Sequence, residues 1–155
     1  MRNIRGTLII CDQVYQDHSG KFILAGTYTT WQTQEDELHV HGIHAYLRLQ
    51  VEQPGSFSCR IAMADRMASP NHAPMVRMDT VLQISERQIP VFECAVHLPD
   101  LTLRAPTPRA QRAPGSAHGI RTLVTLEVGN EDVASCPLDF VFLGPAAPTP
   151  PAAGA

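Results

Sequence analysis

The sequence predicts an all-β fold, a two-layer antiparallel β-sandwich of about eight strands with an immunoglobulin-like or similar arrangement. Three observations favour it. Apolar and polar residues alternate with the two-residue period of a strand in several stretches, and short polar turns separate these stretches. No stretch of about ten residues has the 3.6-residue period of an amphipathic helix. A closed β-barrel is the nearest alternative.

The first expected element is a β-hairpin. The apolar run from Leu8 to Cys11 is too short for a stable helix, and a second strand-like stretch follows from Lys21 to Tyr28. Between them, residues 17–20 read Asp-His-Ser-Gly, which are residues typical of a reversing turn. The two stretches are therefore expected to pair.

The clearest alternation lies at 43–52, and a Pro-Gly turn at 54–55 joins it to a second alternating stretch at 57–64. A loop rich in proline is expected at 66–74, followed by strands at 76–84 and 92–98. The residues expected to face the core are Ile43, Ala45, Leu47, Leu49 and Val51, then Phe57, Cys59, Ile61 and Met63, then Val76, Met78, Thr80, Leu82 and Ile84, and finally Phe92, Cys94, Val96 and Leu98.

Two further strands are expected at 120–128 and 133–143, joined by a turn at 129–132. Their inward residues would be Ile120, Thr122, Val124, Leu126, Val128, Cys136, Leu138, Phe140 and Phe142. The segment 31–38 is the only candidate for a helical turn, and its acidic run at 35–37 suits an exposed connection between sheets.

Residues 105–119 contain little apolar bulk and three prolines, so we expect a long mobile loop that forms no packed element. Deleting residues 106–117 would then leave thermal stability nearly unchanged. The domain is expected to span 1–144. Residues 145–155, a tail of proline and alanine without charge, are expected to be disordered.

Composition excludes some classes of function. The formal net charge of −3 argues against binding to a nucleic acid backbone. The apolar run that begins at Leu8 is shorter than the core of a secretory signal, and no stretch approaches the roughly 18 apolar residues of a membrane span. We therefore expect a cytoplasmic protein that contacts no membrane.

The four cysteines, Cys11, Cys59, Cys94 and Cys136, lie far apart in the sequence and inside strand-like runs. They are expected to be buried thiols that act as small hydrophobic residues, with an inter-sheet disulfide as the minor alternative.

The hairpin sequence contains Ile-Cys-Asp at 10–12, Val14, Gly-Lys at 20–21 and Leu-Ala-Gly-Thr-Tyr at 24–28. With these residues, and with a strand at 46–49 that is similar in kind, the chain resembles an uncharacterised bacterial domain family of unknown function. The resemblance covers about the first third of the chain. The resemblance implies a β-sandwich and assigns no activity, so no catalytic residue follows from it.

The most suggestive cluster of side chains for a metal is His39, His41 and His44. On an extended strand His39 and His41 project to the same side, and a bulge at Gly42 would let His44 join them. A glutamate does not follow at the spacing that cupin-type metal sites use, and a distant fourth ligand has only weak candidates. Solvated histidines at the entrance of a strand are the alternative interpretation. No cofactor is expected.

The expected partner-binding feature is the arginine-bearing loop, with Arg104, Arg109, Arg112 and Arg121 available to carboxylates or phosphates of a partner. A solvated hairpin tip is the alternative. No nucleophile motif for a hydrolase is present. Open sheet edges would allow a homodimer, to which Tyr28, Trp31 and Tyr46 could contribute aromatic anchors.

The sequence therefore leaves two hypotheses about function. The first is a non-enzymatic binding or assembly module that contacts a protein partner or a second copy of itself. The second is a metal-dependent small-molecule enzyme or sensor built on the three histidines.

Overall fold

The computed structural model describes residues 4–68 and 72–146, and it confirms the all-β class. The described residues form eleven strands rather than about eight, with two short 3-10 turns. The strands are β1 (Arg5–Gln16), β2 (Phe22–Thr27), β3 (Thr30–Thr33), β4 (Glu37–Val40), β5 (His44–Gln50), β6 (Gly55–Asp65), β7 (Val76–Ile84), β8 (Val91–His97), β9 (Leu101–Arg104), β10 (Ala117–Val128) and β11 (Glu131–Leu143), and the turns are η1 (Glu86–Gln88) and η2 (Arg109–Gln111).

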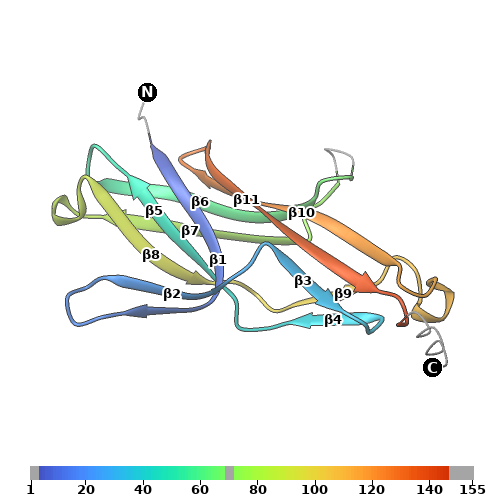
Figure 1. The fold of residues 1–155 in the computed structure, drawn as a ribbon. Coiled ribbons are helices and arrows are strands. Elements are labelled where there is room, and N and C mark those ends of the chain that lie inside the picture. Colours follow the sequence, from blue (N-terminus) through green and yellow to red (C-terminus); the bar gives the residue numbers. More distant parts are fainter. Residues whose placement is uncertain (1–3, 69–71, 147–155) are drawn as a thin grey trace.

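The strands form three sheets. A four-stranded sheet has the order β2-β1-β5-β8, a five-stranded sheet has the order β3-β11-β10-β6-β7, and β4 pairs with β9 in a two-stranded ribbon. In Figure 1 the long strands β10 and β11 run the length of the molecule, past the four-stranded sheet at one end and the β4–β9 ribbon at the other. The expected antiparallel pairing holds except at β3, which lies parallel to β11.

One buried apolar cluster joins all three sheets. The alternation at 43–52 is confirmed, since its five odd-numbered residues are at most 2% exposed. The expected core face of β7 is buried only at Leu82 and Ile84, while Thr80 is exposed. The reason is that β7 is the outer strand of its sheet and has a neighbour on one side only.

The expectation of a helical turn at 31–38 is wrong. This segment contains β3 and the start of β4, and the strand β9 was also not foreseen. Each of these strands is four residues long, too short for a pattern of alternation to stand out. They exist because residues distant in the chain pair with them: β11 pairs with β3, and β4 and β9 pair with each other.

The expectation that 105–119 forms no packed element is also wrong. The 3-10 turn η2 lies inside it, β10 begins at Ala117, and the side chain of Arg112 is buried. The segment is held to the end of β11, because Gly144 N–H donates to the Ser116 carbonyl (2.8 Å) and Gly115 N–H donates to the Pro145 carbonyl (2.9 Å). Beyond 146, the expected tail lies outside the described residues.

The expected hairpin is confirmed as β1 and β2. The strand β1 pairs with β5 through its first half, up to Cys11, and with β2 through its second half. The hairpin therefore extends past the end of its pairing with β5, as Figure 1 shows near β8. It is packed against the sheet by the ring of Phe22, whose centroid lies 5.5 Å from that of Tyr46.

In the part of the chain that the structure describes, no helix is long and apolar enough to cross a membrane.

Candidate functional site

Of the four arginines expected to bind a partner, Arg112 is engaged inside the chain. Its side chain is fully buried, and its guanidinium donates to three carbonyls: Thr107 (2.9 Å), Leu143 (2.6 Å) and Glu35 (3.2 Å). It also forms an ion pair with the Asp36 carboxylate. Arginine has five N–H donors in a rigid fork, and here that fork ties three separate segments together. Arg112 is therefore not available to a partner.

The other three arginines remain exposed. Arg104 is an ion-pair partner of Glu37 (Nε to carboxylate oxygen, 2.8 Å), with its side chain 83% exposed. Arg109 donates its backbone N–H to Asp36, and its side chain is at the surface, as is that of Arg121. Their role in binding a partner stays a prediction.

The first two of the predicted metal ligands lie together. The rings of His39 and His41 are parallel, with centroids 6.1 Å apart. Each imidazole has its own polar neighbour: Nδ1 of His39 lies 3.0 Å from the Thr102 hydroxyl, and Nδ1 of His41 lies 3.0 Å from the Asp100 carboxylate. That hydrogen bond from His41 is the main reason that the pKa of Asp100 is lowered.

The third predicted ligand, His44, has different neighbours. Its Nδ1 lies 2.9 Å from the Asp12 carbonyl, and its ring meets the ring of His97 edge to face at 5.1 Å. Within 4–68 and 72–146, no group of three or more His, Cys, Asp or Glu side chains could hold a metal ion. The structure thus pairs His39 with His41 and His44 with His97, and it does not gather the three predicted ligands around one point.

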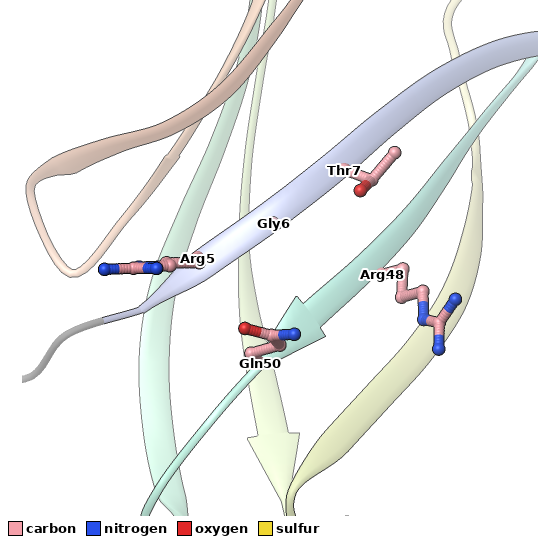
Figure 2. Close-up of a pocket in the computed structure, with 5 residues that line it drawn as sticks. All are labelled: Arg5, Gly6, Thr7, Arg48 and Gln50. Atoms are coloured by element: carbon pink, nitrogen blue, oxygen red, sulfur yellow. The ribbon is translucent and has the colours of Figure 1, made fainter.

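A polar hollow of about 290 Å³ lies on the outer face of the four-stranded sheet, lined by Arg5, Gly6, Thr7, Arg48 and Gln50. Figure 2 shows the guanidinium groups of Arg5 and Arg48 directed away from each other. Arg48 lies 3.3 Å from a carboxylate oxygen of Glu93 on β8. The five lining residues include two arginines and no carboxylate, imidazole or thiol.

The four cysteines lie wholly or partly inside the fold. All four are free, Cys11 and Cys59 are buried as expected, and Cys94 and Cys136 are half-buried. Burial raises the pKa of Cys59, Cys94 and Cys136 to about 11. Since the thiolate is the nucleophilic form of cysteine, a raised pKa disfavours nucleophilic chemistry at these thiols near neutral pH.

The three aromatic residues expected as interface anchors are packed within the chain. Tyr46 is 7% exposed and donates its hydroxyl to Glu93 (2.7 Å). Burial and then that hydrogen bond raise the pKa of Tyr46 to about 12. The ring centroids of Tyr28 and Trp31 lie 4.5 Å apart with the ring planes tilted by 34°, and both side chains are half-buried.

The structure instead exposes an apolar pair that sequence reasoning missed. Tyr15 of β1 and Ile23 of β2 lie directly opposite each other and are 52% and 48% exposed. Opposite residues in an antiparallel pair point to the same side, so the two side chains share one face of the hairpin. We call this pair the hairpin face. The alternation with Val14 and Leu24, both half-buried, was the signal in the sequence that could have located it.

Hydrogen bonds to the Asp17 carboxylate stabilise the turn that joins β1 and β2. One carboxylate oxygen of Asp17 accepts from Ser19 N–H (2.8 Å), the Ser19 hydroxyl (2.6 Å) and Lys21 N–H (2.9 Å), and Gly20 takes a positive φ of 84°. Such side-chain bonds to nearby backbone are how aspartate stabilises turns. The two residues of the hairpin face therefore lie next to a turn that local hydrogen bonds hold in place.

We expect the order of this turn to depend on acid pH. The hydrogen bond from the Ser19 hydroxyl is the main reason that the pKa of Asp17 lies below its usual value of 3.8. A lowered pKa in the folded state gives a stabilisation that is complete above the unfolded-state value and is lost as the pH falls through the folded-state value. Amide chemical shifts of Ser19 and Lys21, followed by NMR, should move at a pH below 3.8. The same shifts in an Asp17→Asn variant should stay constant, and movement there would contradict the assignment.

Comparison with known proteins does not assign the chain to a family. No protein-family model matches the chain. No curated protein is similar to it at a significant level. The resemblance of the hairpin sequence to an uncharacterised bacterial family stays a prediction.

Proposed function

We propose that this chain is a non-enzymatic binding or assembly module and that the hairpin face is its contact surface. The observation that carries the proposal is the pair Tyr15 and Ile23, about half exposed and side by side on a hairpin whose Phe22 packs against the sheet. Burial of apolar surface drives most protein association, and tyrosine is enriched among the residues that dominate it.

The order of the hairpin supports the same proposal. A contact surface that is already in its bound conformation loses less conformational entropy on binding. The Asp17 bonds fix the turn, and the ladder between β1 and β2 fixes both strands. In the arginine-bearing loop, by contrast, Arg112 is buried and donates a hydrogen bond to the Leu143 carbonyl at the end of β11.

We also propose that the two larger sheets are the layers of a β-sandwich. The supporting observation is that the four-stranded and five-stranded sheets contribute to one buried cluster, with Leu47 and Leu49 on one side and Ile61 and Leu126 on the other.

The proposal can be tested by site-specific photocrosslinking. With Tyr15 replaced by p-benzoylphenylalanine, irradiation in an extract of the organism that makes the chain should yield a protein adduct, because the probe then sits inside the contact. The control carries the same probe at Val81, which is 56% exposed on the outer strand β7. Adducts are read by gel shift and mass spectrometry, with self-adducts and adducts to other proteins scored separately.

An adduct at position 15 that is several-fold stronger than at position 81, and that weakens when Ile23 is changed to lysine, supports the proposal. Equal labelling at both positions, or no adduct at position 15, contradicts it.

A further inference from the structure

The strand β2 is a free edge of the four-stranded sheet. It is the last strand in the order β2-β1-β5-β8, and among the described residues only β1 pairs with it. A free edge presents unpaired N–H and C=O groups, which can pair with a strand of another chain. Natural proteins block such edges with charged residues, prolines or very short strands.

The edge of β2 lacks these protections. Its sequence, Phe-Ile-Leu-Ala-Gly-Thr at 22–27, has no charge and no proline. The other outer strands of the two larger sheets differ: β7 carries Arg77 and Asp79, β8 carries Glu93, and β3 is four residues long. Together with the exposed Ile23, this makes β2 the edge best suited to pairing with another strand.

We infer that two copies of this chain associate edge to edge through β2, forming one continuous sheet across a two-fold axis. The inference rests on the proposed function, since it names the partner of the hairpin face as a second copy. A two-fold contact uses the same patch on both copies and must therefore be self-complementary.

The sequence of β2 meets that requirement. In a first register, centred on Ile23, antiparallel pairing places Ile23 opposite Ile23 of the second copy. In a second register, centred on Leu24, Ile23 lies opposite Ala25 of the second copy. In the first register the flanking Lys21 faces Ala25, and in the second it faces Thr27, so no like charges meet across the contact. In both registers the hairpin faces of the two copies join into one apolar surface that includes both Tyr15 rings.

The test is the association state of the full chain, measured by analytical ultracentrifugation up to about 100 μM, which covers micromolar dissociation constants. We expect a dimer, twice the chain mass of 17.0 kDa. Ile23→Lys should weaken dimerisation by about tenfold or more, because it sets an ammonium group in the apolar contact. The matched control is Val81→Lys, which makes the same charge change at a similarly exposed site on an edge already charged, and it should change the dissociation constant by less than about twofold.

A second readout does not depend on a loss of binding. Under mild oxidation Ile23→Cys should form a disulfide-linked dimer in the first register, because directly opposite residues in an antiparallel pair have Cβ atoms about 4.5 to 5.5 Å apart, close to the spacing that a disulfide spans. Ala25→Cys combined with Ile23→Cys covers the second register. The native cysteines are buried or half-buried and serve as the background.

A monomer throughout the concentration range, or a dimer that both lysine variants leave intact, overturns the inference. If the chain is monomeric while the Tyr15 probe still labels a different protein, only the self-association fails and the binding proposal stands. If the chain is monomeric and the Tyr15 probe labels nothing, both fail.

Discussion

Replacing Arg112 by alanine is expected to lower the free energy of unfolding by about 3 kcal/mol. The fully buried guanidinium donates to the carbonyls of Thr107, Leu143 and Glu35, so its removal leaves three acceptors without their donor. These acceptors belong to the loop before β10, the end of β11 and the connection between β3 and β4. Urea unfolding followed by circular dichroism measures the loss.

The matched control lies three residues away. Arg109 has an exposed side chain, and its interaction with Asp36 uses only the backbone N–H, so Arg109→Ala should change stability by less than about 0.5 kcal/mol. Asp36→Asn should have a smaller effect than Arg112→Ala, because the Asp36 side chain is 56% exposed and solvent screens the ion pair. Similar losses of stability for Arg112→Ala and Arg109→Ala would show that the buried hydrogen bonds of Arg112 do not stabilise the fold.

The same geometry changes what we expect from deleting 106–117. The sequence alone predicted almost no change in thermal stability. Because this deletion removes Arg112 and the Thr107 carbonyl that it binds, we now expect a loss at least as large as that of Arg112→Ala.

Replacing Phe140 by alanine is expected to lower the free energy of unfolding by about 3 to 5 kcal/mol. Phe140 is fully buried in β11, where it lies opposite Ile120 of β10 and Trp31 of β3. The loss combines the transfer free energy of the ring with the cavity that the neighbouring strands cannot close. Chemical denaturation of the variant beside the parent chain gives the difference.

Phe22→Ala removes the same atoms from a half-buried site on β2. It should lower the free energy of unfolding by about 1 to 2 kcal/mol, because the Phe22 ring buries less apolar area on folding than the Phe140 ring does. A loss at Phe22 as large as that at Phe140 would mean that the hairpin, and not the cluster shared by the sheets, dominates stability.

The long strands, and most of the side chains facing the core outside β7, followed from the sequence by itself. The alternation at 43–52, 57–64 and 120–128, and the Asp-His-Ser-Gly turn, are local patterns, since strand period and turn chemistry depend on neighbours a few residues away. These elements were predicted because the signal for each lies within the element.

The tertiary structure alone decided the short strands, the role of Arg112 and the candidate contact surface. Arg112 and Asp36 are 76 residues apart, and β3 exists through its pairing with β11. Tyr15 and Ile23 lie on the part of the hairpin beyond the β1–β5 pairing, which ends at Cys11. His44 contacts His97, whereas His41 contacts Asp100. Burial and pairing of this kind are set by residues brought together from distant parts of the chain, and no local pattern of residues encodes them.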